Sequence, residues 1–150
     1  MKFSRLLING LIIFIGIAVY FLLIEALGLQ DQIYLRLVNF VFVIYGVNRT
    51  IKSNVHDGIR GYVKNILAGF ITAMVGLIVG LIAFMIYIEY KGGNTYLETF
   101  ADSYIFGGGS PSLYQFCFGL FVEGAASSMI VSFAMMQYWK NKVENINEAD

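Results

Sequence analysis

Apolar residues along the chain come in four long blocks rather than in alternating stripes. The blocks cover residues of about 6–27, 32–51, 64–90 and 111–139. A helix needs ~20 consecutive, mostly apolar residues to cross a bilayer, and a lone strand cannot satisfy its backbone groups in lipid. The pattern therefore predicts one all-α domain, an integral membrane four-helix bundle that spans the membrane four times, followed by a polar tail over 140–150.

Composition supports a membrane protein. The chain is 58% hydrophobic and 13% charged, whereas a soluble domain is usually about a quarter charged. Its net charge of +0 creates no global field toward nucleic acid, so the expected partner is membrane lipid. The single cysteine, Cys117, lies in an apolar run without metal-ligand spacing. It is expected to act as a small hydrophobic residue, and we expect neither a metal nor a cofactor.

The distribution of Lys and Arg predicts the orientation, because cytoplasmic loops carry an excess of both. Most of them precede the first block, lie around the link between the second and third, or follow the fourth. These residues are Lys2, Arg5, Arg49, Lys52, Arg60, Lys64, Lys140 and Lys142. We therefore expect both termini in the cytoplasm.

The link between the third and fourth blocks predicts a short helix. The sequence TYLE, residues 95–98, fits a capping box, and aromatic and apolar residues follow at helical spacing: Tyr96, Leu97, Phe100 and Tyr104. This favours an amphipathic helix in the outer membrane interface, with its aromatic side chains toward lipid or the rim of the bundle. An ordered loop that binds a partner is the alternative. Ser110 and Pro111 then suit the start of the fourth helix.

Small residues form a strip along the third block. They recur at intervals of 4, 3, 4 and 3 and are Gly69, Ala73, Gly76, Gly80 and Ala83. Such a strip lets another helix approach closely. Gly124 and Ser128 give the fourth block small residues of its own, so we expect these two helices to pack together. A homodimer face is the alternative use of the strip.

The stretch GLFVEGAASSMIVS, residues 119–132, places Glu123 within an apolar and small-residue run. If Tyr138 and Trp139 lie in the aromatic belt at the cytoplasmic surface, Glu123 lies roughly two turns below the outer boundary of the hydrocarbon. Arg36 falls at a similar depth. We predict a charge-assisted contact between Arg36 and Glu123.

Neighbouring polar residues extend this predicted cluster. Glu25 and Glu89 lie near the same outer plane and are possible further acceptors, because an arginine has five donors. Ser127 lies one turn after Glu123 and could donate to it. The cluster would either fix the helices and dock a partner, or form a proton or cation site. Intramembrane charges cost ~2.5–3.5 kcal/mol and are usually functional, but no broken helix typical of a transporter is visible.

Catalytic motifs do not occur in the chain, which contains no HExxH, GxSxG, Walker loop or CxxC. We therefore expect a protein that is not an enzyme. The first hypothesis is an accessory or scaffold subunit of a larger membrane complex, bound to other membrane subunits. The alternative is a small transporter or channel, a homo-oligomer that uses the Glu123 and Arg36 site.

The layout resembles a family of small four-span bacterial inner-membrane proteins, a domain of unknown function. The resemblance rests on a hairpin of the first two blocks and on a basic loop that leads through GIRGYVKNILAGF into the third. That block is rich in glycine and ends in YIEY, and a polar loop and the fourth block follow. It implies a multi-pass protein of the bacterial cytoplasmic membrane, and it transfers no catalytic residue.

Overall fold

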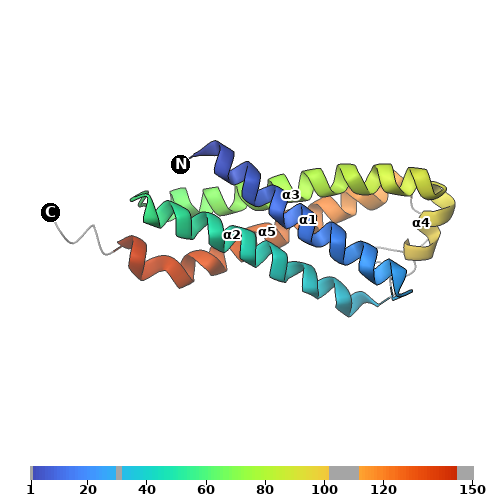
Figure 1. Cartoon of the computed structure of the whole chain (residues 1–150), viewed down its shortest axis with the longest axis horizontal. Coiled ribbons are helices and arrows are strands. Elements are labelled where there is room, and N and C mark those ends of the chain that lie inside the picture. Colours follow the sequence, from blue (N-terminus) through green and yellow to red (C-terminus); the bar gives the residue numbers. More distant parts are fainter. Residues whose placement is uncertain (1, 30–31, 102–111, 145–150) are drawn as a thin grey trace.

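The computed structural model describes residues 2–29, 32–101 and 112–144, and all elements in these ranges are helices. In chain order they are α1 (Phe3–Ala26), the 3-10 helix η1 (Ile33–Val38), α2 (Asn39–His56), α3 (Tyr62–Lys91), α4 (Asn94–Ala101) and α5 (Leu113–Glu144). The four long helices run side by side, and α4 lies across one end of the bundle (Figure 1).

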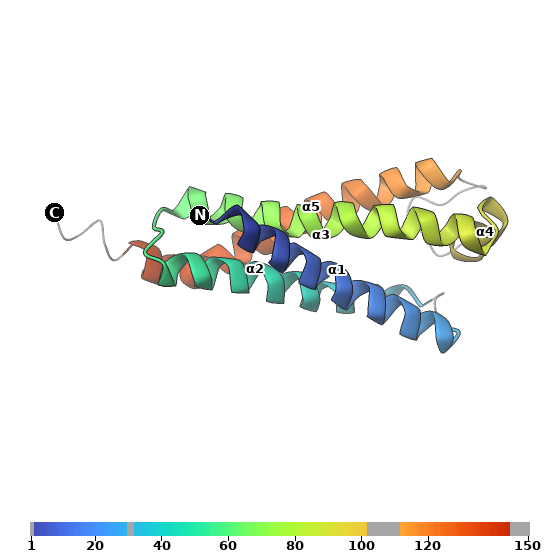
Figure 2. The same cartoon turned by 45° about the horizontal axis from the view of Figure 1, so that its top comes forward.

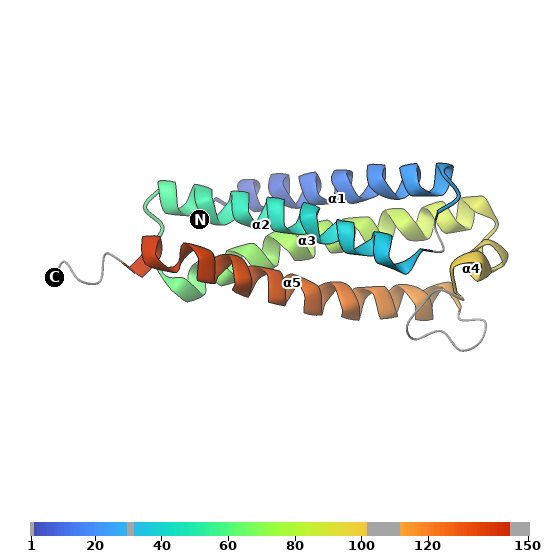
Figure 3. The same ribbon diagram turned by 90° about the horizontal axis from the view of Figure 1, so that it is seen from below.

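Helix α3 is the centre of the bundle, because it contacts α1, α2, α4 and α5. Helices α1 and α2 form an antiparallel pair, and α2 also contacts α5 (Figure 3). The start of α1 and the end of α5 lie at the same end of the bundle, opposite α4 (Figure 1). The bundle therefore has a terminal end and an α4 end.

The second helix differs from its predicted extent. It begins as a 3-10 helix and continues as an α-helix to His56, about five residues beyond the predicted end. Lys52 is therefore helical, although it was expected in the loop after the second block. The connection to α3 is short and ends at Gly61, whose φ is +114°.

Glycines end α1 and α2 in the same way. Gly28 and Gly58 have φ values of +66° and +71°, which an L side chain rarely adopts. At each site the glycine N–H bonds to the carbonyl of the third residue before it, and the next N–H bonds to the fifth residue before it. This Schellman arrangement satisfies carbonyls that would otherwise be left unpaired.

Three helices are long and apolar enough to cross a membrane: α1, α3 and α5 over Leu113–Val143. The protein thus has the character of a membrane protein. Helix α2 is the fourth member of the bundle but does not meet the same criterion, because its second half carries Arg49, Lys52 and His56 while the apolar Ile33–Val38 belongs to the separate η1.

The core is concentrated at the terminal end. Buried residues of α1 lie within Leu6–Ile13, and those of α2 within 46–54. The main apolar cluster there joins residues of α2, α3 and α5: Val47, Ile51, Ala73, Val131, Met136, Trp139 and Val143. We call this part of the bundle the closed half.

The part toward α4 is packed much less closely. No described side chain is buried over 14–26 of α1, 34–45 of η1 and α2, 77–87 of α3 or 118–127 of α5. The ribbons of α1 and α5 also diverge toward this end (Figure 2). We call these four ranges the open half. Beyond them, a small cluster at the α4 end joins α3, α4 and α5: Ile88, Leu97, Leu113, Phe116 and Cys117.

The short helix predicted after the third block is present as α4. It begins at Asn94, one residue before the predicted cap, and its Leu97 is buried. Its place in a membrane interface stays a prediction. Tyr104, Ser110 and Pro111 lie outside the described residues, as does the end of the polar tail, 145–150.

Candidate functional site

A buried polar chain joins three helices in the closed half. The Asn9 amide of α1 donates to the hydroxyl oxygen of Thr50 in α2 at 2.9 Å. The Thr50 and Thr72 hydroxyls lie 3.0 Å apart, and the Thr72 hydroxyl also donates to the Ala68 carbonyl. All three polar side chains are at most 1% exposed. Because buried polar groups must be paired, this chain fixes how α1, α2 and α3 meet.

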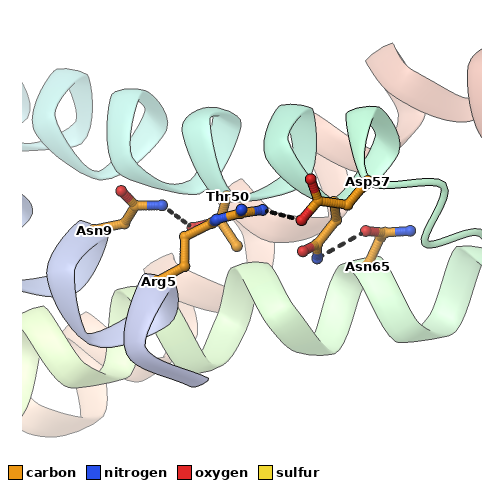
Figure 4. Close-up of polar contacts among 6 residues, drawn as sticks. Arg5, Asn9, Thr50, Asp57 and Asn65 are labelled. Carbon is orange, nitrogen blue, oxygen red and sulfur yellow. Dashed lines mark hydrogen bonds and ion pairs between the residues drawn. The ribbon is translucent and has the colours of Figure 1, made fainter. Parts of the chain in front are cut away.

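A second polar contact closes the turn between α2 and α3. The Asn54 amide donates to the Asn65 carbonyl oxygen at 3.1 Å. The Asn65 amide in turn donates to the backbone carbonyls of Ile59 and Gly61, at 3.2 and 3.1 Å. Figure 4 shows Asn65 directed from α3 toward α2. One side chain thus holds the turn and the neighbouring helix together.

An ion pair ties the start of α1 to the end of α2. The Arg5 guanidinium donates to the Asp57 carboxylate at 2.7 Å, and it reaches across from α1 in Figure 4. The hydrogen bond from Arg5 holds the pKa of Asp57 below its ordinary range. Both side chains are about 30% exposed, so water screens this pair.

Sequence reasoning missed these neutral polar residues, although their spacing carries a signal. Asn65 and Thr72 alternate with Gly69 and Gly76 at intervals of 4, 3 and 4 along α3. They therefore share the small-residue strip, and all four are buried. A polar side chain on a close-packing strip faces another helix, and this rule would have selected both residues.

Glu25, one of the predicted acids, is held at the α4 end. The hydroxyls of Tyr87 in α3 and Tyr96 in α4 each donate to one oxygen of its carboxylate. The Lys91 ammonium lies 3.4 Å from the same carboxylate and over both tyrosine rings. Burial, and then the Glu25 carboxylate, raise the pKa of Tyr96. The group pins α4 and the end of α3 to the end of α1.

The remaining predicted polar residues lie at separate places. Glu123 is exposed on α5, with Ser127 half-buried one turn on, and Glu89 is exposed near the end of α3. Arg36 is half-buried in η1. Among the described residues, no Cα atom of η1 lies within 8 Å of one in α5. The contact between Arg36 and Glu123 stays a prediction.

The small-residue strip of α3 packs against several neighbours within the chain. A Cβ atom at Gly76 would lie 2.9 Å from the Gly10 carbonyl oxygen of α1, and one at Gly69 would lie 2.9 Å from Val47 of α2. Ala73 is also buried, whereas Gly80 and Ala83 are half-buried in the open half.

The fourth helix approaches the same strip from the other side. A Cβ atom at Gly69 would lie 3.3 Å from the Ser132 hydroxyl of α5, and one at Gly124 would lie 2.5 Å from Leu77 of α3. Ser128 is buried and donates to the Gly124 carbonyl. The close partners of α3 are thus α1, α2 and α5 together, rather than α5 alone.

The expected belt residues Tyr138 and Trp139 face different ways. Tyr138 is 74% exposed, but Trp139 is only 8% exposed and belongs to the core cluster. The Trp139 indole N–H donates to the Asn48 side-chain oxygen at 2.7 Å. An indole with a polar partner can be buried, so Trp139 joins α5 to α2, and its place at a membrane surface stays a prediction.

The open half also contains a polar atom without a hydrogen-bond partner. This atom is the side-chain oxygen of Asn39, the first residue of α2, and it is buried. Leaving a buried acceptor unpaired costs about 1–3 kcal/mol. The open half therefore holds a polar group that its own described residues do not satisfy.

Comparison of the chain with protein-family models, with curated proteins and with solved structures finds no match. Inference about its task therefore depends on the arrangement of its own residues. That arrangement consists of a closed half held by buried polar contacts and an open half that carries Arg36, Asn39 and Glu123.

Proposed function

We propose that the protein is a non-enzymatic accessory or scaffold subunit of a larger membrane complex. In this proposal it docks to other membrane subunits through its open half. The chain crosses the cytoplasmic membrane of a bacterium four times, with both termini in the cytoplasm, as the resemblance to four-span inner-membrane proteins implies.

The observation that carries this proposal is the absence of buried side chains from the open half. Over 14–26, 34–45, 77–87 and 118–127, all four long helices leave their described side chains partly or fully exposed. Closely packed helix contacts drive association inside a membrane. A half-bundle whose own helix contacts leave its side chains partly exposed is suited to receive helices from another subunit.

Glu123 gives this surface a polar contact. It is exposed on α5 next to Val122 and near Phe118, whose exposed fractions are 47% and 68%. An exposed carboxylate on an apolar surface can accept hydrogen bonds from the donors of another membrane subunit.

The proposed topology follows from the shape and the charges. Helices η1 and α2 together cover 33–56, and they run along the bundle beside the three apolar helices (Figure 3). Most basic residues lie near the terminal end of the bundle, which would face the cytoplasm.

A small oligomeric transporter or channel is the second candidate. It is favoured by three polar groups of the open half, Arg36, Asn39 and Glu123, which could contact an ion or a proton if copies of the chain assembled around them. The two candidates differ in what the chain assembles with: other membrane subunits in the first, and further copies of itself in the second.

Site-specific photo-crosslinking in native membranes tests the proposal. A photoreactive residue at Val122 in the open half should give adducts with a different membrane subunit. The matched control is Val63 at the terminal end of α3, which is more exposed, at 74%, and should give few adducts. Adducts of twice the mass of the chain alone would support the homo-oligomer instead.

Substitution of the carboxylate then separates docking from transport. Glu123→Gln keeps the size of the side chain and removes its charge, so it should weaken the recovery of Val122 adducts severalfold. Glu98→Gln on α4 is the matched control, because Glu98 is exposed outside the open half. Unchanged adducts together with lost ion flux in Glu123→Gln would overturn the accessory-subunit proposal.

A further inference from the structure

An open cavity of about 340 Å³ lies between the first turns of α1 and the second half of α2. Its polar lining consists of Lys2, Ser4, Arg5, Asn9, Arg49 and Ser53. A second cavity of about 220 Å³ shares Arg5 and Ser53 with it. The two form one continuous polar recess at the terminal end of the bundle.

The recess is strongly cationic. Lys2, Arg5 and Arg49 line the first cavity, and no carboxylate does. The second cavity adds Lys52 together with Asp57, which already accepts from Arg5. No ion pair within the described ranges involves Lys2 or Arg49. The recess therefore has cationic donors to spare for an anion.

The side chains around the recess are partly fixed in place. Arg5 is held by Asp57, and its guanidinium has five N–H donors, of which this contact uses one. Asn9 is 1% exposed and is held by its hydrogen bond to Thr50, as Figure 4 shows. Ser4 and Ser53 add hydroxyl donors. Fixed cations and hydroxyls together suit the oxygens of a phosphate group.

An apolar stripe on α1 begins in the same recess. Ile8 lines the cavity, and exposed apolar residues continue from it along one side of the helix: Leu11, Ile15, Val19 and Leu22. Spacings of three and four residues keep such a stripe on one face. A ligand with a phosphate in the recess and an acyl chain along α1 would match both surfaces, whereas inorganic phosphate would use only the first.

We propose that this recess binds the phosphate headgroup of an anionic phospholipid, with an acyl chain along the exposed stripe of α1. Lys2 and Arg49 supply the attraction to the charge, and Arg5 donates to a phosphate oxygen. Attraction of this kind falls with ionic strength, because exposed charges are screened by salt. The polar recess lies at the terminal end of the bundle, whereas Ile15, Val19 and Leu22 of the stripe belong to the open half. Binding of the headgroup therefore does not depend on the docking surface proposed above.

The test is the melting temperature of the full chain in a zwitterionic detergent, titrated with dioctanoyl phosphatidylglycerol. This lipid should stabilise the protein more than dioctanoyl phosphatidylcholine at equal concentration. Lys2→Gln and Arg49→Gln should each weaken its apparent affinity about fivefold, the effect of one basic side chain near an anionic lipid. Lys2 is exposed and outside the helix, so its substitution keeps the test valid even if Arg49→Gln does not fold.

The matched control is Arg60→Gln. Arg60 is an exposed basic residue of the turn between α2 and α3 and does not line either cavity, so its substitution should leave the affinity unchanged. An equal loss in Arg60→Gln and Lys2→Gln would show a diffuse charge effect and overturn the site. Equal stabilisation by sodium phosphate at the same concentrations would identify a free-phosphate site and overturn the assignment to lipid.

Discussion

Asn65 uses both ends of its side-chain amide. Its oxygen accepts from Asn54, and its nitrogen donates to two backbone carbonyls of the turn before α3. A leucine has a similar size but no hydrogen-bonding groups, so Asn65→Leu would leave the Asn54 amide and both carbonyls without this partner. A single neutral side chain thus makes three hydrogen bonds that join the turn to α2 and α3.

We expect Asn65→Leu to lower the free energy of unfolding by about 2 kcal/mol, within the cost of leaving buried polar groups unpaired. Denaturation in mixed detergent micelles, followed by tryptophan fluorescence, measures this change. The matched control is Asn141→Leu, because Asn141 is exposed on α5 and such changes usually stay within about 0.5 kcal/mol. Equal effects of the two substitutions would refute the assigned role.

At the scale of residues, the predicted polar cluster was built almost entirely from charged side chains. Glu25 was predicted as a possible acceptor for Arg36, and in the structure Tyr87, Tyr96 and Lys91 contact its carboxylate. These partners could not be identified because α4 folds back over the end of the bundle, and no spacing rule specifies such a return. Neutral amides and hydroxyls were overlooked, since they are common in all chains.

At the scale of elements, we expect substitution by alanine to have opposite effects at two glycines of α3, Gly76 and Gly80. A Cβ atom at Gly76 would lie 2.9 Å from the Gly10 carbonyl oxygen, whereas one at Gly80 meets nothing nearer than 3.7 Å. Both glycines lie inside the helix, where alanine is intrinsically favoured by up to about 1 kcal/mol.

We therefore expect Gly76→Ala to destabilise the protein by about 1–3 kcal/mol, the usual cost of overpacking. Gly80→Ala should be neutral or stabilising by less than about 1 kcal/mol, because the helix gains without a clash. Melting temperatures of both variants in one detergent test the contrast. If Gly76→Ala melted at or above the temperature of Gly80→Ala, the close approach of α1 and α3 would be wrong.

The apolar blocks predicted α1, α3 and α5 well, because a long apolar segment in lipid must form a helix to pair its own backbone groups. The capping pattern also located α4. The division of the second block into η1 and α2 could not be predicted, since 3-10 and α-helices have similar residue preferences. The helical position of Lys52 was missed because basic residues beyond the second block were taken to mark a loop.

At the scale of the whole molecule, the Arg5 and Asp57 pair closes the terminal end and makes its stability depend on pH. The pKa of Asp57 is lowered in the folded protein by Arg5. Its contribution is therefore fully present above the unfolded value of ~3.9 and is lost as the pH falls through the folded pKa.

We expect the melting temperature to fall as the pH is lowered from 5 to about 2, and Asp57→Asn to reduce this fall. Thermal melts of both proteins across this range provide the measurement. Glu98→Gln alters an exposed acid outside both ion pairs of the described residues and should keep the wild-type profile. A wild-type profile in Asp57→Asn would contradict the contribution of the pair.

The division into a closed and an open half was not predictable from the blocks. Apolar residues continue through α1 on both sides of Ile13, and yet none of the described residues after Ile13 in this helix is buried. Whether an apolar side chain faces a neighbouring helix or lipid depends on how the helices diverge. Lipid tails are as apolar as leucine, so hydropathy does not distinguish the two environments.

The uneven packing has a consequence for the life of the protein in the cell. If the protein docks as proposed, a copy outside the complex keeps Glu123 and many apolar side chains of its loosely packed end exposed. Undocked and docked copies would then differ in how much of this end a membrane protease can reach, so the level of the chain would follow the level of its partner.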